Sequence, residues 1–227
     1  MRKALLVLGV LAMVSCKYKE SGNKGVIPLE DGPTVHGNYS QSPHSPGGDT
    51  VATTGTAAGE LDSRGNFVYN VGNTTTIQLP DGTSMQVGER STENTLYRFL
   101  SDTQRQVSDD KTQDWITLDR VYFDTGSDRL TSDSEAQVRN ITAILNAYPE
   151  AEAKLGGYTD NVGSQEVNQP LSQARANSVM NRIASQGIAA TRLTAEGYGQ
   201  DHPVCAANDT DACKAQNRRV DIRVTRK

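Results

Sequence analysis

The feature that most constrains the fold is a glycine-rich turn between a predicted strand and a predicted helix. The strand is expected at 151–158, and the turn after it carries Asp160 and Gly163. The helix that follows is expected to begin at Ser172 and to carry Arg175. If the helix packs against its strand, Asp160 and Arg175 could come together in one pocket.

A carboxylate and a guanidinium in one pocket suit a zwitterionic ligand. Asp160 would accept hydrogen bonds from an ammonium group, and Arg175 would hold a carboxylate with its planar fork of donors. We expect Pro170 to interrupt any earlier helix, so that Ser172 is the N-cap and Arg175 lies in the first turn, where backbone N–H groups attract a carboxylate. The structural alternative is that Asp160 stabilises the turn and Arg175 pairs with it. Glycines that would let the backbone approach a ligand are Gly156, Gly157 and Gly163.

The segment 114–227 has the pattern of one compact α+β domain. Apolar and β-branched runs predict strands at 115–123, 151–158, 193–198 and 220–224. Ser132 and Glu135 form a capping box for a helix that ends near Pro149, and Gly187 fits the C-terminal cap of the second helix. The predicted order is β-α-β-α-β-β, a mixed sheet with both helices packed on one face.

A small β-rich element and a linker are predicted before this domain, over 60–113. Alternating residues predict two or three strands within 66–87, and Asp81-Gly82 is a strong hairpin signal. A short helix is expected at 92–100, followed by a polar linker over 104–113. The apolar face of that helix consists of Leu96, Phe99 and Leu100. An element this small needs to pack against something else to be stable.

The N-terminus has the pattern of an export signal. A basic start precedes an apolar run from Ala4 to Val14, which is shorter than the ~20 residues that span a bilayer. The run ends at Cys16 as in a bacterial lipoprotein signal, so we expect residues 1–15 to be removed and Cys16 to be lipidated. Lys17 after the cysteine implies the outer membrane. The alternative is an ordinary signal peptide with Cys16 as a free thiol.

Residues 16–59 are predicted to form a flexible tether. They are rich in Gly, Ser, Thr and Pro, and their few large apolar residues cannot bury enough surface to offset chain entropy. Such a tether suits a globular head that is held off a membrane.

Cys205 and Cys213 are predicted to form a disulfide, because the export signal places them in an oxidising compartment. Free thiols and a metal site are the alternatives, and His202 lies nearby without a second pair of ligands at metal spacing. The net charge of −4 and the aromatic content of 5% argue against nucleic-acid binding and against stacking platforms. We therefore predict no cofactor, no metal and no nucleic-acid partner.

A series of short motifs runs in order from Val121 to the end of the chain. They are Tyr122-Phe123-Asp124, Leu130, Gly157-Tyr158-Thr159-Asp160, Gly163, Asn168, Leu171-Ser172, Arg175-Ala176, Gly187-Ile188, Arg192-Leu193, Gly197-Tyr198-Gly199, Pro203 and Asn217-Arg218-Arg219-Val220. In order and spacing, this part of the chain resembles the C-terminal domain of the OmpA-like, or peptidoglycan-associated lipoprotein (Pal), family. The resemblance covers about half of the chain.

The resemblance implies non-covalent binding to the diaminopimelate residue of the peptidoglycan stem peptide. Asp160 and Arg175 would hold the zwitterionic end of diaminopimelate. Further positions that match the family's pocket are Asn168, Arg218, Asp124, Gly126 and Val162. Gly126 stands where some members have an asparagine. We expect Arg219 to have a structural role and not to contact the ligand.

Three functions are open at this stage. The first is a non-enzymatic anchor, lipid-bound to the outer membrane with its domain gripping peptidoglycan in the periplasm. The second is a cell-wall hydrolase or amidase, which needs a nucleophile with a base, a zinc site or a carboxylate pair such as Asp160 and Glu166. The third is a partner-binding envelope lipoprotein of the Tol-Pal type, which is compatible with the first. We predict the anchor and no enzyme.

Overall fold

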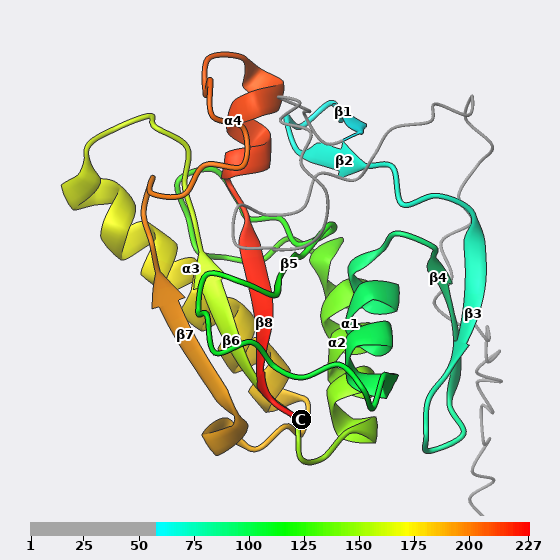
Figure 1. The fold of residues 1–227 in the computed structure, drawn as a ribbon. Coiled ribbons are helices and arrows are strands. Elements are labelled where there is room, and N and C mark those ends of the chain that lie inside the picture. Colours follow the sequence, from blue (N-terminus) through cyan, green and yellow to red (C-terminus); the bar gives the residue numbers. More distant parts are fainter. Residues whose placement is uncertain (1–57) are drawn as a thin grey trace, which may run out of the picture.

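The computed structural model describes residues 58–227 (Figure 1). The predicted signal peptide, the lipidation site Cys16 and nearly all of the predicted tether lie outside the described residues.

A four-stranded mixed sheet forms the centre of the domain. Its strands are β5 (Trp115–Thr117), β6 (Glu152–Gly157), β7 (Leu193–Gly197) and β8 (Val220–Arg226), and they stand in the order β5-β8-β6-β7. Strands β6 and β7 are parallel, because the chain crosses back through a helix between them. Strand β8 is antiparallel to both of its neighbours, β5 and β6.

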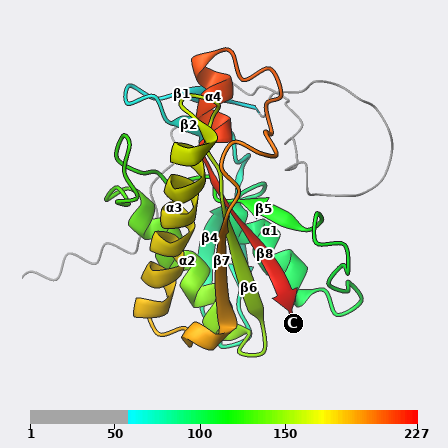
Figure 2. The same ribbon diagram turned by 90° about the vertical axis from the view of Figure 1, so that its left-hand side faces the viewer.

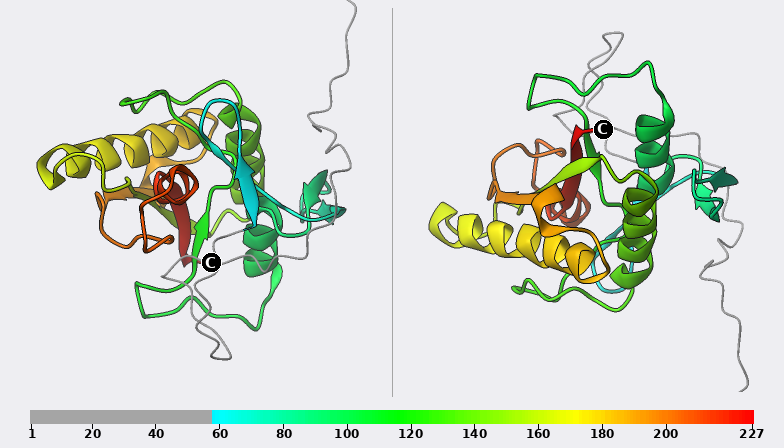
Figure 3. Two further views of the ribbon diagram at one scale, coloured as in Figure 1. Left: turned by 90° about the horizontal axis from the view of Figure 1, so that it is seen from above. Right: turned by 90° about the horizontal axis from the view of Figure 1, so that it is seen from below.

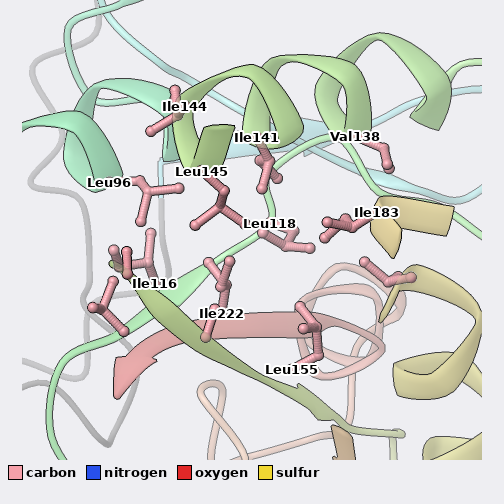
Figure 4. Packing of buried hydrophobic residues seen from close by; sticks show 14 of the residues in the cluster. Leu96, Ile116, Leu118, Val138, Ile141, Ile144, Leu145, Leu155, Ile183 and Ile222 are labelled. Atoms are coloured by element: carbon pink, nitrogen blue, oxygen red, sulfur yellow. The ribbon is translucent and has the colours of Figure 1, made fainter. Parts of the chain in front are cut away.

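Helices α2 (Ser134–Ala147) and α3 (Gln165–Ser185) cover one face of this sheet (Figure 2). Leu155 and Ile222 from the sheet meet Ile141 and Leu145 from α2 and Ile183 from α3 (Figure 4), and each of the five is at most 1% exposed. Truncating one such side chain to alanine typically costs about 2–5 kcal/mol. The predicted α+β fold with helices on one face of a mixed sheet is confirmed.

The chain before the sheet forms two short hairpins and a helix. Strand β1 (Gly59–Leu61) pairs with β2 (Phe67–Tyr69), and β3 (Thr74–Gln78) pairs with β4 (Ser84–Gly88). Helix α1 (Thr92–Ser101) follows, as predicted. The Asp81-Gly82 turn is also confirmed, with Gly82 at φ +86°. The structure has four strands here where two or three were expected.

These N-terminal elements share the core of the sheet. Ile77 and Val87 from the β3–β4 hairpin and Leu96 and Phe99 from α1 belong to the same buried cluster as Ile222. The hairpin lies on the outer side of α1 and α2 (Figure 1). Packing against the domain therefore supplies the support that so small an element needs.

A buried polar network also joins α1 to the domain. The Thr92 N–H donates to Asp119 Oδ2 at 2.9 Å, the Gln137 amide donates to the same carboxylate, and Glu93 pairs with Arg120. Burial, together with the charge of Glu93, raises the pKa of Asp119 to about 6. Separating α1 from the sheet would break the bond from Thr92 to Asp119 and the ion pair of Glu93 with Arg120, and losing such buried partners is costly.

Two predicted boundaries are wrong. Strand β5 ends at Thr117 and not at 123, because Asp119 and Arg120 turn away into the network with α1, and Phe123 makes only an isolated bridge with Leu130. The predicted capping box is absent as well. Helix α2 starts at Ser134, and its N-cap residue makes no side-chain capping bond.

The prediction for α3 is also wrong at its N-terminus. The helix begins at Gln165 with Ser164 as its N-cap, and Pro170 lies inside it. The first turns are held by tertiary contacts, since Gln169 Nε2 donates to the Gly197 carbonyl at 2.7 Å and Asn168 bonds the preceding turn. These contacts offset the single backbone hydrogen bond that Pro170 cannot make. The C-terminal cap at Gly187, with φ +109°, is as predicted.

Candidate ligand-binding site

Close packing of α3 on the sheet places the Asp160 turn. A Cβ on Gly157 would lie 2.1 Å from the Ser172 carbonyl oxygen, and one on Gly197 would lie 2.3 Å from the Gln173 nitrogen. Gly156 similarly faces the Trp115 ring. The expectation that Gly156 and Gly157 admit a ligand is therefore wrong, because helix and indole already fill that space.

Asn168 holds the turn that carries Asp160. Its Nδ2 donates to the carbonyls of Val162 at 3.2 Å and Asp160 at 3.4 Å and to Gln200 Oε1 at 3.3 Å. The Val162 N–H donates to Asp160 Oδ1 at 3.1 Å. Gly163 has φ +92°, a backbone conformation that glycine adopts without strain. The turn is thus fixed from α3, and the Val162 side chain points outward with 61% of its surface exposed.

Asp160 is buried and paired with Arg218. Arg218 Nη1 lies 2.8 Å from Asp160 Oδ2, and Arg218 Nη2 donates to the Gly65 carbonyl at 3.1 Å. Asp160 is 7% exposed. A charge-assisted bond in a partly desolvated turn fixes the carboxylate before any ligand arrives.

Arg175 lies in the middle of α3, close to this pair. Its Nε donates to the Ser127 carbonyl at 2.9 Å, and its guanidinium carbon is 5.1 Å from the centre of the Phe123 ring. Burial lowers the pKa of Arg175, the charge of Arg218 lowers it further, and Asp160 opposes them. No carboxylate within residues 58–227 lies at ion-pairing distance from it. Arg175 is not at a helix N-terminus, so the expected help from first-turn N–H groups is absent.

The turn at 124–127 supports Arg175 through its backbone. The Asp124 carboxylate pairs with Arg129, on the exposed side. Gly126 is exposed with φ +66°, and the Ser127 carbonyl is the group that meets Arg175. The structure therefore brings together Asp160, Asn168, Arg175, Arg218 and the Val162 backbone. It turns the side chains of Asp124 and Val162 away from that group.

A cleft beside Arg175 and Arg218 contains residues that sequence reasoning did not assign to the site. It has an empty volume of about 470 Å³, part of it open to solvent. Its walls include Arg219, which is 3% exposed and donates from Nε to both oxygens of Asp221 at 3.0 and 3.1 Å. Four further unassigned wall residues belong to the β1–β2 hairpin: Gly65, Asn66, Phe67 and Tyr69. The remaining ones are Leu118, Val121, Tyr122, Phe123 and Ala215. No sequence signal links this hairpin to Arg218, more than a hundred residues away.

The short helix α4 (Asp211–Asn217), which was not predicted, ends at Arg218. The Thr210 side chain caps its start by accepting from the Cys213 N–H. Cys205 and Cys213 form the predicted disulfide, with their Cα atoms 5.3 Å apart. Asn217 bonds both backbone groups of Cys205, at 3.0 and 2.9 Å. Seen from above (Figure 3), α4 lies next to the β1–β2 hairpin, with which it is in contact.

The described residues, 58–227, contain neither a cluster of metal-ligating side chains nor a helix suited to span a membrane. No group of three or more His, Cys, Asp or Glu side chains in this part of the chain could hold a metal ion. No helix in it combines the length and apolar character needed to cross a bilayer.

This geometry defines a class of protein: an α+β domain with a charged cleft at one end of its sheet. The sequence of residues 122–218 matches the model of the OmpA family. This part of the chain is an OmpA-family domain, as the sequence motifs indicated.

Three curated relatives illustrate the similarity. The peptidoglycan-associated lipoprotein of Agrobacterium fabrum is 34% identical over 44% of this chain and 56% of its own length. The probable lipoprotein YiaD of Escherichia coli is 38% identical over 45% of this chain and 46% of its own length. The outer membrane protein Omp38 of Acinetobacter baumannii is 36% identical over 47% of this chain and 30% of its own length. The chain thus spans less than two thirds of each of these relatives.

Solved structures give matches of similar extent. The peptidoglycan-associated lipoprotein from Burkholderia pseudomallei is 31% identical over 47% of this chain and 90% of that chain, with a TM-score of 0.44. The periplasmic domain of Helicobacter pylori MotB is 22% identical over 50% of this chain and 74% of that chain, with a TM-score of 0.45.

The disulfide should stabilise the loop that leads into α4. Replacing both Cys205 and Cys213 by serine should lower the free energy of unfolding by about 2–3 kcal/mol, because the loop gains entropy in the unfolded chain. Urea denaturation of the oxidised protein and the double variant measures the difference. Reduced wild-type protein is the control and should match the variant, while equal stability of oxidised protein and variant would contradict the prediction.

Proposed function

We propose that this protein binds peptidoglycan non-covalently, through the zwitterionic end of diaminopimelate in the stem peptide. The single observation that carries the proposal is that Asp160, a fixed and buried carboxylate, lies near Arg175, a buried guanidinium that forms no ion pair within residues 58–227. Asp160 would accept the ligand's ammonium, and Arg175 would receive its carboxylate.

The chemistry of the two groups supports this assignment. A zwitterion is costly to strip of water, so its site needs charges that are already in place. Asn168 and Arg218 fix the Asp160 turn, and the Ser127 carbonyl orients Arg175 while leaving its terminal nitrogens for a ligand. Because burial and Arg218 both disfavour the charge on Arg175, a bound carboxylate would relieve an electrostatic cost.

The relatives support the same function. Two of the proteins that match this chain are named peptidoglycan-associated lipoproteins, one in sequence from Agrobacterium fabrum and one in structure from Burkholderia pseudomallei. The segment that matches the OmpA family, residues 122–218, contains Asp160 and Arg175. The names concern those proteins, and their relevance here depends on the side chains described above.

We propose binding without catalysis. The conceivable carboxylate pair of Asp160 and Glu166 lacks a group suited to act as a general acid, because a hydrogen bond from Ser164 lowers the pKa of Glu166. Asp160 itself is engaged by Arg218. His202 is the one histidine outside the predicted tether, and its ring lies edge-on to the Tyr198 ring, with the ring centres 5.8 Å apart.

We further propose that a lipid on Cys16 holds the chain in the outer membrane, with the domain in the periplasm. The sequence around Cys16 and the lipoprotein names of two relatives support this. A protein that grips the wall at one end and the membrane at the other gains from bivalency, so each wall contact can be weak. Contacts with other envelope proteins are compatible with this arrangement.

Substitutions at the charge pair test wall binding. Asp160→Ala and Arg175→Ala should each abolish retention by purified sacculi, since each removes one partner of the zwitterion, and circular dichroism should show an unchanged fold. Arg182→Ala is a matched control, because Arg182 lies on the same helix but pairs with Glu135 on the surface. Full retention of the two site variants would place the site elsewhere, and release of soluble muropeptides by the wild type would indicate hydrolysis.

Substitution of the lipidation site tests the anchor. Cys16→Ala should leave the signal uncleaved by the lipoprotein peptidase, because that enzyme acts at a lipidated cysteine, and the variant should not partition normally into the outer membrane. Membrane fractionation measures the partition into the outer membrane, and an immunoblot shows from the size of the protein whether the signal was cleaved. Cys16→Ala protein that is processed and fractionates like the wild type would exclude the lipid anchor.

A further inference from the structure

The β1–β2 hairpin, residues 59–69, lies outside the segment that matches the OmpA family, yet it lines the cleft beside Arg175 and Arg218. It touches α4, and the two lie together at one end of the molecule (Figure 1). Residues 122–218 alone would lack this wall, so the hairpin changes what the cleft can accept.

We propose that the β1–β2 hairpin is a functional part of the binding site, in which its turn holds Arg218 in position and its inner side encloses the acidic end of the ligand. Gly65 and Asn66 are then positioning and specificity-determining residues. This inference rests on the proposed function, because it concerns the same ligand.

Arg218 is held from two sides, and one of them is the hairpin. Nη1 binds the Asp160 carboxylate at 2.8 Å, and Nη2 donates to the Gly65 carbonyl at 3.1 Å. The Arg218 side chain is 36% exposed, so water could otherwise compete for its outer edge. The Gly65 carbonyl restricts the rotamers of a long side chain, and that ordering is complete before the ligand binds.

The hairpin is fixed by contacts that need no ligand. Phe67 is 4% exposed and packs against Ala215 of α4. The Tyr122 hydroxyl donates to the Phe67 carbonyl at 3.3 Å, and Arg64 forms an ion pair with Asp133 before α2. These contacts spread from the strand to the turn, which makes the hairpin a wall attached to the domain.

The cleft between this wall and the domain suits a carboxylate on an aliphatic stem. Three arginine residues line it, Arg175, Arg218 and Arg219, and no acidic residue of the described chain does. Arg218 pairs with Asp160 and Arg219 with Asp221, so Arg175 is the one of the three without an ion pair in residues 58–227. Arg219 Nη1 is buried without a hydrogen-bond partner. Val121 and Phe123 supply an apolar floor. Because the space remains empty, the hairpin encloses the site and does not plug it.

One side chain organises the turn that presents the Gly65 carbonyl. Asp62 Oδ1 accepts from the backbone N–H groups of Arg64 at 2.9 Å and Asn66 at 2.8 Å, and Oδ2 accepts from the Asn66 side chain at 2.9 Å. Asp62 does not line the cleft. The β3–β4 hairpin has a similar turn, in which Asp81 Oδ1 accepts from the Thr83 N–H at 2.8 Å. This turn lies at the other end of the molecule from the β1–β2 hairpin (Figure 1).

The test compares Asp62→Ala with Asp81→Ala. Both remove one negative charge and the bond to the backbone N–H two residues on, and Asp62→Ala also removes the two bonds to Asn66. A diaminopimelate-containing stem tripeptide is titrated calorimetrically into the wild-type protein and both variants. Asp62→Ala should weaken binding about fivefold or more, as expected when a hydrogen bond to a charged group is loosened, and Asp81→Ala should stay within about twofold of the wild type.

Two results would overturn the proposal. Equal binding by Asp62→Ala and Asp81→Ala would show that the hairpin does not contribute, and tighter binding by Asp62→Ala would show that it obstructs the site. Both leave the proposed function intact if Asp160→Ala abolishes binding of the same tripeptide. Failure of the wild-type protein to bind the tripeptide would remove the proposed function and this inference together.

Discussion

The ion pair between Asp160 and Arg218 is the interaction on which the site depends. It fixes the carboxylate at the turn after β6, and it positions a second cation next to Arg175. A buried guanidinium without a carboxylate of its own is unusual, because burying a charge normally requires a partner. Here a backbone carbonyl and an aromatic face give Arg175 partial compensation, and the remaining attraction is available to a ligand.

The rest of the fold keeps these groups in place. Glycines at 157 and 197 let α3 approach the sheet, and α3 then supplies both Arg175 and the amide of Asn168 that ties down the turn. On the other side, the disulfide and α4 lead directly into Arg218. The β3–β4 hairpin shares the core of the sheet, and the β1–β2 hairpin packs on α4 and reaches the cleft.

The sequence alone predicted the chain order of the four domain strands and the two long helices, α1, the Asp81-Gly82 turn and the disulfide, because each has a local signature in periodicity, turn residues or compartment. It failed where tertiary contacts override local preference. Pro170 lies inside α3 since Asn168 and Gln169 hold the first turns, and β5 ends early since Asp119 and Arg120 join α1. The approach of Gly65 to Arg218 has no local signature, so only the structure could place that hairpin at the site.

The most direct test of the central claim uses two stem tripeptides that differ by one side-chain carboxylate. One ends in diaminopimelate and the other in lysine, which keeps the side-chain ammonium but lacks the carboxylate beside it. If Arg175 receives that carboxylate, calorimetry should show the diaminopimelate peptide binding at least about tenfold more tightly, as loss of a charged hydrogen-bond pair implies. Equal affinities for the two peptides would contradict a site built for both charges.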